Sequence, residues 1–492
     1  MSLNVPSRSI LGTYYRSPLG VRNSGTAEKC RQYFEFQVEA EAGYELLMVF
    51  VSSWIMLYKP DGTQEELRSP TSPDHRLYIT HVAGDDGWYG ALAFGTLQPW
   101  DRFRLIALND FGGKRRHDFY NGWRGCLPKI LYPVTAIRLN RCLTYLHTLD
   151  TFGTKIKTLD LRMLPDLRQL NVGGFEDEIF LEEIKFDNPN LYEMLLSSVK
   201  IRELDKTKFP NLYRLAITRN MDLPILDLAG LPRLQELTIT NSYEREVLCY
   251  ECPSLYAIDI DEMENLEILD VHDSNLNYLS INKANSLERI NLAGLQKLYQ
   301  VSLKDNASLA RIACQRCPEL YAFRVEDCPN FVFIGLPNVP PAEGSVRTRM
   351  RYLEIINCEK FTSIDVSGAP DLDTLTITGT SLATINLSSF NTHYDEYYYN
   401  TKCDLHNNQL TSVKFGAVPP IYLNLEDNNL DTEAVESVIG KVDSYYAERG
   451  IGGGTLLLKG NGRIHWWYVY AMERLGRLGW TTSFSWPPLG NP

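Results

Sequence analysis

The sequence lacks the long apolar stretches that are typical of membrane-spanning helices and of signal peptides. No stretch approaches the roughly 18 consecutive apolar residues of a transmembrane helix. The opening stretch, MSLNVPSRSILGTYYRSPLG, has no apolar run of the length that a signal peptide needs. We therefore expect the protein to be made and folded in a cytosol, or to leave the cell by a route that its N-terminus does not encode.

Positive charge is also scarce. The chain has 49 lysines and arginines against 61 aspartates and glutamates, which gives a net charge of −12. A nucleic-acid backbone or an anionic membrane surface requires a basic face, so neither is expected as the main partner. The short basic run GGKRRH at 112–117 has the composition of a solvated linker.

Recognisable catalytic motifs are missing. The eight histidines are scattered, and neither HExxH nor a nucleophile elbow occurs. The segment RGIGGGT at 449–455 lacks the Lys-Ser/Thr ending of a phosphate loop and precedes an expected strand. Asp395 and Glu396 are adjacent, so they cannot flank a scissile glycosidic bond. We expect a protein that is not an enzyme and holds no cofactor.

Cysteine is present, and two pairs have the CxxC form, CYEC at 249–252 and CQRC at 314–317. Alone they suggest a four-thiolate zinc site. The pairs lie too far apart along the chain for a zinc ribbon. The repeat pattern accounts for them better, so no metal site is expected.

A repeat dominates the middle of the chain. The pattern L-x-x-L-x-[LIV] recurs at intervals of about ten or eleven residues. Clear copies are LRQLNV (167), LQELTI (234), LEILDV (266), LERINL (287) and LDTLTI (372). The copies are of two alternating kinds. One kind is often followed by an apolar residue and proline, and the other has a small or polar residue eight places after its start. Asn306, Cys328, Cys358 and Asn408 occupy that place.

The full unit of about 21 residues resembles the leucine-rich repeat of the bacterial type, with two strand-like segments in each turn. The resemblance covers roughly residues 130–430. It implies a mainly β solenoid of about twelve turns, with the small or polar residue satisfying backbone groups in the turn. Apolar residues with a period of two would point into one continuous core. Cys252, Cys317, Cys328 and Cys358 fall on inward positions, where reduced cysteine acts as a small hydrophobe.

Tyrosine is concentrated on one of the two strand-like segments, the one that lines the concave face in leucine-rich repeats. The first or second outward position of that segment holds Tyr192, Tyr213, Tyr256, Tyr278, Tyr299, Tyr321 and Tyr352. At the first outward position, the opposite segment carries mostly charged residues: Lys157, Glu182, Arg202, Glu267, Glu288 and Thr362. High strand propensity would explain tyrosine by itself. The asymmetry between the faces favours a binding stripe for a protein or a glycan.

Two insertions interrupt the repeat, at 337–347 and near 391–400. Both fall at the same place in the unit, after the second strand-like segment and before the segment that lines the concave face. The second contains a cluster that we interpret as a contact loop at the concave rim: Tyr394, Asp395, Glu396, Tyr397, Tyr398 and Tyr399. Insertions on one face of a solenoid are often contact loops. The alternative is that this loop folds back over an apolar rim.

The two ends of the chain lack the repeat. Residues 1–128 contain several short apolar runs separated by glycine or proline, which predicts a β-sandwich-like domain preceded by an extended arm. Residues 431–492 predict a small α/β cap with a helix at 431–450, a strand at 455–458, a helix at 464–476 and a strand at 480–486. The solenoid would occupy 129–430.

The order of motifs in the last 60 or so residues resembles the C-terminal end of leucine-rich proteins encoded by bacteriophages and Bacteroidota. The resemblance implies a virion or tail-associated protein that is assembled in the host cytoplasm. Its N-terminal domain would bind the particle, and the solenoid would present its tyrosines to a host-surface protein or glycan. The alternatives are a bacterial surface adhesin, which needs an export signal, and an effector delivered into another cell, with an activity in residues 1–128.

Overall fold

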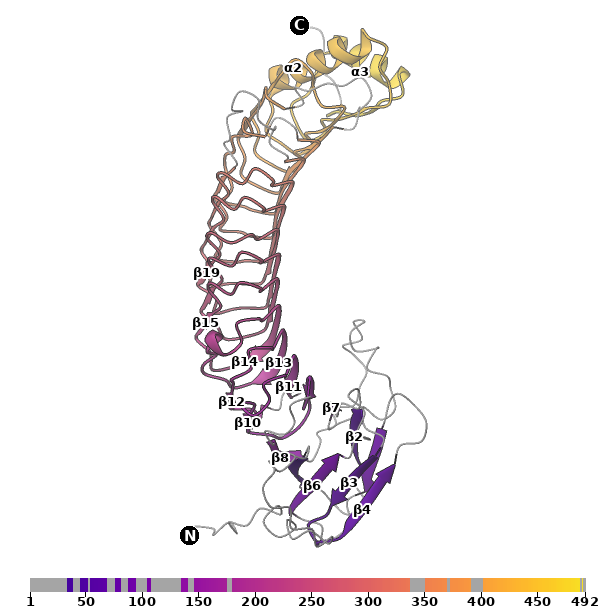
Figure 1. Ribbon diagram of the computed structural model, residues 1–492. Helices are drawn as coiled ribbons and strands as arrows, with labels where there is room; N and C mark the ends of the chain where they lie inside the picture. The colour runs from indigo at the N-terminus through magenta and orange to yellow at the C-terminus, as the bar shows by residue number, and fades with distance from the viewer. Residues whose placement is uncertain are drawn as a thin grey trace. The chain divides into compact units, whose positions relative to one another are not determined.

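Figure 1 shows the computed structural model. It describes residues 33–38, 45–51, 54–68, 76–80, 87–93, 104–107, 134–139, 146–174, 179–336, 350–369, 372–390, 401–486 and 489. The chain forms two compact units, residues 1–210 and 211–492.

The first unit begins with antiparallel strands. One sheet has the order β4-β3-β6-β1-β8, and a second has the order β5-β2-β7. The strands are β1 (Tyr33–Val38), β2 (Glu45–Val51), β3 (Trp54–Tyr58), β4 (Gln64–Arg68), β5 (Arg76–Thr80), β6 (Gly87–Ala93), β7 (Arg104–Ala107) and β8 (Val134–Leu139). Phe34 and Phe36 are buried, and Phe36 stacks on Tyr89 at 5.3 Å between ring centroids. The larger sheet continues through β8, past residue 128. The expected N-terminal arm and the basic run at 112–117 lie outside the described residues.

The first unit then changes to parallel strands. β9 (Thr148–Asp150), β11 (Gln169–Gly173) and β13 (Glu193–Val199) pair in register, and β10 (Thr158–Asp160) pairs with β12 (Glu183–Lys185). The buried side chain of Asn188 donates hydrogen bonds to the carbonyl oxygens of Leu161 at 2.9 Å and Leu164 at 2.8 Å. These are backbone acceptors in the preceding turn, as the resemblance to leucine-rich repeats implies for a polar residue in the turn. A short 3₁₀ helix, η2 (Lys206–Lys208), follows.

The second unit is a stack of turns whose first strands form one parallel sheet, called here the long sheet. Its strands are β14 (Arg214–Asn220), β16 (Glu236–Thr240), β18 (Ala257–Asp261), β20 (Tyr278–Asn282), β22 (Gln300–Lys304), β24 (Ala322–Glu326), β26 (Tyr352–Ile356), β27 (Thr374–Thr378), β29 (Lys402–Asp404), β31 (Tyr422–Asn424), β32 (Thr455–Leu457) and β33 (Thr481–Ser483). Within this unit the stack bends with the long sheet on its inner side (Figure 1). Side chains alternate along each strand, as in β20, where Leu279 and Ile281 are buried between half-exposed neighbours.

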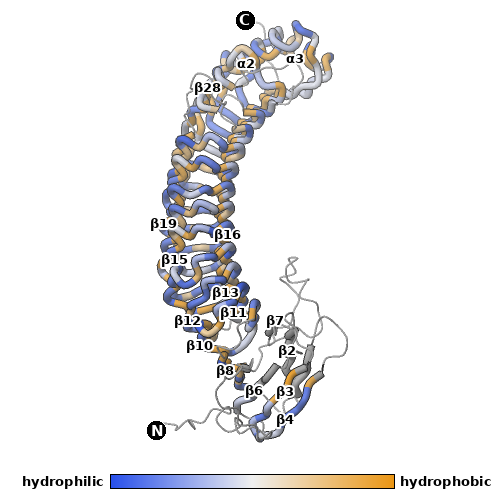
Figure 2. The backbone as a smooth tube through the Cα atoms, in the orientation of Figure 1, coloured by the Kyte–Doolittle hydropathy of each residue, from blue (hydrophilic) through white to orange (hydrophobic). Residues whose placement is uncertain are grey.

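The opposite side of the second unit carries shorter strands, called here the short strands. β15 (Ile225–Asp227), β17 (Glu246–Leu248) and β19 (Ile268–Asp270) form one sheet, and β21 (Arg289–Asn291), β23 (Arg311–Ala313) and β25 (Phe333–Gly335) form another. β28 (Thr384–Leu387) pairs with β30 (Ser412–Phe415). Figure 2 shows β15 and β19 on the side of the stack away from β16. Both rows of strands send aliphatic side chains into the space between them, which makes the continuous core.

The C-terminal end closes the stack with two helices. Asp431 caps α2 (Thr432–Val442) by accepting a hydrogen bond of 2.8 Å from the Ala434 N–H. A π-helical turn (Asp443–Ala447) follows, and α3 (Trp466–Arg477) comes after β32. Val435, Val438, Ile439, Val442 and Tyr446 are buried, on the side that the sequence predicts.

The predicted fold class is confirmed: the protein is mainly β, and its repeats form a leucine-rich-repeat solenoid. Each turn of the solenoid contributes one strand to the parallel sheet. Among the described residues, β9, β11 and β13 precede residue 211, and ten strands of the long sheet lie between residues 211 and 431, which is close to the roughly twelve turns expected. No helix in the described part of the chain has the length and apolar character needed to cross a membrane.

Candidate binding surface

Five tyrosines form a continuous row of rings along one border of the long sheet. We call Tyr256, Tyr278, Tyr299, Tyr321 and Tyr352 the tyrosine column. Ring centroids of successive members are 5.0, 5.9, 5.0 and 5.3 Å apart. Tyr299 and Tyr321 stack almost parallel, at 4° between ring planes, and the other neighbours are tilted. The column therefore crosses five successive turns without a gap.

The column joins two different sequence positions. Tyr278 is the first residue of β20, whereas Tyr256 lies one residue before β18. In the register of these two strands, Tyr278 is opposite Ala257, so Tyr256 is one residue out of step with Tyr278. Both positions face outward because the chain turns a corner there, as the exposure of Tyr256 and the half-exposure of Ala257 show. The rings of adjacent turns can therefore touch although their backbones are offset by one residue.

Backbone hydrogen bonds connect the turns that carry the rings. The N–H of Tyr278 donates to the carbonyl oxygen of Tyr256 at 2.9 Å, and the N–H of Tyr321 donates to that of Tyr299 at 2.8 Å. Tyr256 and Tyr352 are 45% and 40% exposed, and the three members between them are half-buried. The result is an aromatic surface that is partly exposed and whose rings already contact one another.

The phenol groups interact along the column. A hydrogen bond with Tyr278 raises the pKa of Tyr256, and burial followed by a hydrogen bond with Tyr352 raises the pKa of Tyr321. Both tyrosines are therefore neutral at physiological pH. A neutral phenol has an O–H donor for a partner in addition to its aromatic face.

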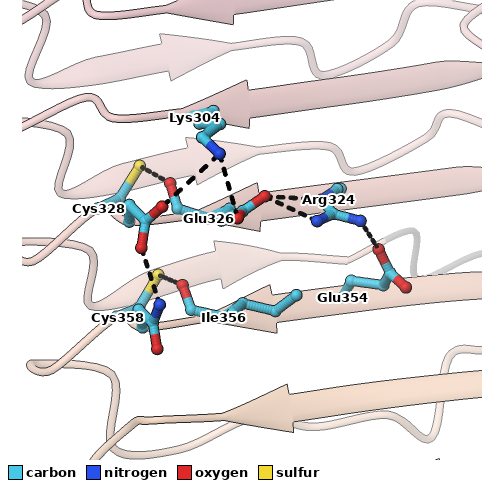
Figure 3. Close-up of polar contacts among 9 residues, drawn as sticks. Lys304, Arg324, Glu326, Cys328, Glu354, Ile356 and Cys358 are labelled. Atoms are coloured by element: carbon cyan, nitrogen blue, oxygen red, sulfur yellow. Dashed lines mark hydrogen bonds and ion pairs between the residues drawn. The ribbon is translucent and has the colours of Figure 1, made fainter.

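Charged residues lie on the outward face of the long sheet, in the same strands that the column precedes or begins. Arg324 donates to Glu354 at 2.7 Å and to Glu326 at 2.7 Å, and Lys304 reaches Glu326 at 3.3 Å (Figure 3). The hydrogen bond from Arg324 is the main cause that lowers the pKa of Glu326. This network places both signs of charge on the face of the sheet that begins at the tyrosine column.

The remaining predicted tyrosines lie outside the column. Tyr213 immediately precedes β14, and in the next turn Gln235 stands where a tyrosine would continue the row towards Tyr256. Tyr192 immediately precedes β13 in the first unit. Both are exposed. The predicted rim loop, with Tyr394, Asp395, Glu396, Tyr397, Tyr398 and Tyr399, lies outside the described residues, as does the insertion at 337–347.

Sequence reasoning missed Tyr422, which begins β31 at the same register as Tyr278 and Tyr352. The ammonium group of Lys402 lies 5.3 Å from the centre of its ring. The signal was available, because PIYLNL at 420–425 is a copy of the repeat with tyrosine at the second outward position.

The opposite face is less uniformly charged than the sequence predicts. Ile225, Ile268 and Phe333 are 47%, 45% and 48% exposed on the short strands, at positions adjacent to the charged ones. Each short strand carries two neighbouring outward residues at its start, and the charged residues that the sequence identified occupy the first of these two positions.

Within the described residues, the cysteines lie in the core. Cys249, Cys252, Cys314, Cys317, Cys328, Cys358 and Cys403 are buried and not joined in disulfides. The thiols of Cys328 and Cys358 donate to the carbonyl oxygens of Glu326 and Ile356 at 3.3 and 3.4 Å (Figure 3). Burial raises the pKa of Cys328 to about 11 and that of Cys358 to about 12. These are properties of packed thiols rather than of reactive ones.

No protein-family model matches the sequence, and no curated protein does. Among solved structures, the functional domain of InlJ from Listeria monocytogenes, which includes a cysteine ladder, is 15% identical over 65% of this chain and 70% of that chain, with a TM-score of 0.29. A leucine-rich-repeat protein of Leptospira interrogans is 16% identical over 70% of this chain and 91% of its own, with a TM-score of 0.32. The leucine-rich-repeat domain of APL1 is 14% identical over 61% and 73%, with a TM-score of 0.34. The assignment of the fold rests on the strand registers described above and not on these likenesses.

Proposed function

We propose that this protein is a non-enzymatic binding protein that holds a protein partner against the tyrosine column. The observation that carries the proposal is the unbroken contact of five tyrosine rings along an exposed border of a rigid sheet. Tyrosine gives a large contact area at a small cost in side-chain entropy. Rings that already pack on one another lose still less freedom when a partner binds.

The charged neighbours favour a protein as the partner. Tyrosine and arginine are among the residues that contribute most to protein–protein binding energy. Arg324 lies in a network of both charge signs, which would be matched by the mixed polar surface of a protein. A glycan on the same tyrosines is the second candidate ligand, because sugars also pack on exposed aromatic rings.

We further propose that the protein is a component of a bacteriophage particle, attached through residues 1–128. The support for this setting is the sequence of residues 431–492, whose order of motifs resembles leucine-rich proteins of phages and Bacteroidota. An adhesin or a delivered effector would use the same solenoid surface in another location.

The test is affinity purification of the tagged full chain from its native source, with identification of the co-purifying proteins. Three forms are compared: the unchanged chain, the triple variant Tyr256→Ala/Tyr299→Ala/Tyr321→Ala, and the control Tyr243→Ala/Tyr470→Ala. Both control residues are exposed tyrosines outside the column, 48% and 68% exposed. The control therefore removes phenol groups without altering the column.

We expect a partner that the unchanged and control chains retain and that the triple variant loses while it remains folded. Retention by all three forms would refute the role of the column. Capsid, portal or tail proteins at fixed stoichiometry support the particle component, and their loss on deletion of 1–128 supports the proposed attachment. Recovery of host-surface proteins alone contradicts the particle assignment and leaves the binding role of the column in place.

A further inference from the structure

A groove lies on the short-strand side of the second unit, away from the tyrosine column. Its volume is about 670 Å³, and its walls include Ile268, Arg289, Ile290, Arg311, Ile312 and Phe333. Cavities that bind small molecules have volumes of roughly 300 to 1,000 Å³. The groove is therefore large enough for a small organic ligand.

The groove lies across an interruption in the strand pairing. β19 ends one three-stranded sheet and β21 begins the next, so the short strands of these two turns do not form one ladder. Residues from both sides of this seam line the groove, from Glu267 on one side to Phe333 on the other. Exposed Ile268 and Phe333 stand at its two ends and give it apolar walls.

Two arginines stand side by side within the groove. Arg289 and Arg311 are direct register partners in β21 and β23, and both are exposed. Like charges that lie directly opposite each other on neighbouring strands are unfavourable. The guanidinium carbon of Arg311 is 5.9 Å from the centre of the Phe333 ring, so charge and aromatic surface adjoin.

Neither of these arginines forms an ion pair within the described part of the chain, whereas many others do. Arg245 pairs with Glu267 at 2.6 Å, Arg324 with Glu354 at 2.7 Å and Arg162 with Asp160 at 2.7 Å. The two carboxylates that line the groove already have partners, Glu267 in Arg245 and Asp270 in His272 at 2.6 Å. Arg289 and Arg311 themselves are thus left without a carboxylate partner in the described part of the chain.

We propose that this groove binds a small organic anion whose carboxylate or phosphate is held jointly by Arg289 and Arg311 and whose apolar body packs on Phe333 and Ile268. Guanidinium groups match the geometry of both oxyanions through paired N–H donors. An anion between the two arginines also removes their mutual repulsion. Because the whole chain carries a charge of −12, attraction of an anion has to come from this local pair.

The test uses phenyl phosphate and 3-phenylpropanoate as probes and the methyl groups of isoleucine as reporters. Ile268, Ile290 and Ile312 line the groove, and Ile239 and Ile260 lie buried under the long sheet. Methyl NMR spectra of the full chain are recorded during titration with each probe. Benzylammonium, with a similar aromatic body and the opposite charge, is the matched control.

We expect both anions to shift the signals of the three groove isoleucines with a dissociation constant of about 1 mM, and to leave those of Ile239 and Ile260 unchanged. Arg289→Gln should weaken binding about tenfold, as expected for a charged hydrogen bond. Arg162→Gln removes the same charge from an ion-paired arginine elsewhere and should have no effect. Phe333→Ala should weaken phenyl phosphate more than inorganic phosphate.

Three results would overturn the proposal. The first is no shift of the groove signals with either anion at about 10 mM, roughly ten times the expected constant. The second is an equal response to benzylammonium, which would mean an apolar surface without selectivity for anions. The third is unchanged binding in Arg289→Gln and Arg311→Gln, with a spectrum that shows both variants to be folded. If phenyl phosphate binds and 3-phenylpropanoate does not, the ligand is a phosphate, and the reverse result identifies a carboxylate.

Discussion

Glu244 and Asn220 meet inside the hydrophobic core of the second unit, where Asn220 Nδ2 donates a hydrogen bond of 3.4 Å to Glu244 Oε1. Glu244 is 0% exposed, and its Oε2 has no hydrogen-bond partner. In later turns, leucine occupies the position of Glu244, as Leu382 and Leu410 show. An aliphatic residue that is buried or half-buried stands three residues after each leucine, and Val247 stands three residues after Glu244. A carboxyl group thus replaces a core leucine, and burial raises its pKa to about 7.

This carboxyl group should make the stability of the fold depend on pH. The pKa of Glu244 is about 7 in the folded protein, against an ordinary value of 4.5. Because the folded state binds the Glu244 proton more tightly than the unfolded state, protonation stabilises the folded protein. This stabilisation is complete below pH 4.5 and is lost as the pH rises through 7. The loss is about 3 kcal/mol, since one pKa unit corresponds to about 1.4 kcal/mol. Denaturant unfolding at a series of pH values between these limits measures it.

Two variants separate the charge from the shape of this residue. Glu244→Gln keeps the shape and cannot ionise, so the pH dependence over this interval should flatten. Glu244→Leu restores the side chain found in the equivalent turns and should stabilise the protein above pH 7, because no charge is then buried. The same slope in Glu244→Gln as in the unchanged chain would show that Glu244 is not the titrating group.

A second prediction concerns Asn408, whose side chain links its own turn to the preceding one through hydrogen bonds. Its Oδ1 accepts from the Thr380 N–H at 3.0 Å, and its Nδ2 donates to the carbonyl oxygens of Ile377 at 2.6 Å and Leu405 at 2.8 Å. Asn408→Ala leaves these buried groups without partners and should cost about 3 kcal/mol of unfolding free energy. Asn429→Ala, at an exposed asparagine nearby, should cost under about 0.5 kcal/mol. Similar costs for the two variants in denaturant unfolding would contradict this account.

The solenoid could be predicted because its physical basis is local and repeated. Leucine at fixed spacing predicts which residues point inward, and Leu279 and Ile281 do so. The turn that contains Glu244 escaped the pattern, since a glutamate stands where the motif requires an apolar residue. Strand β8 was missed for another reason: it pairs with β1, about a hundred residues earlier, and no local pattern encodes such a distant pairing.

The binding surfaces could be predicted only in part. The sequence identified the tyrosines of the column by their outward positions. It could not show that Tyr256 and Tyr278, at different positions of their repeats, touch ring to ring, because that depends on the corner before each strand. The groove with Arg289 and Arg311 was not found from the sequence, since the seam between β19 and β21 is a feature of spatial packing. The roles of the column and the groove remain predictions.

A third prediction concerns the reactivity of the core thiols. Burial raises the pKa of Cys358 to about 12, so almost no thiolate exists at neutral pH, and the thiol is shielded from solvent. Iodoacetamide should therefore leave Cys328 and Cys358 unmodified in the native protein and label both after denaturation. Peptide mass spectrometry after timed alkylation measures this, and free cysteine in the same mixture shows that the reagent is active. Native labelling at the rate of free cysteine would mean that these turns open readily.

The last prediction separates torsional strain from steric overlap at two glycines with similar backbone angles. Gly294 has φ of +86° and open space where a Cβ would lie, whereas Gly460, also at +86°, has the Asp427 Cα and N at 2.9 Å from that point. Gly294→Ala should cost about 1 kcal/mol, the penalty of a left-handed residue alone. Gly460→Ala should cost about 3 kcal/mol because the backbone of Asp427 must also move. The unfolding midpoints of the two variants test this. Equal losses of unfolding free energy would mean that the backbone near Gly460 moves aside at no measurable cost.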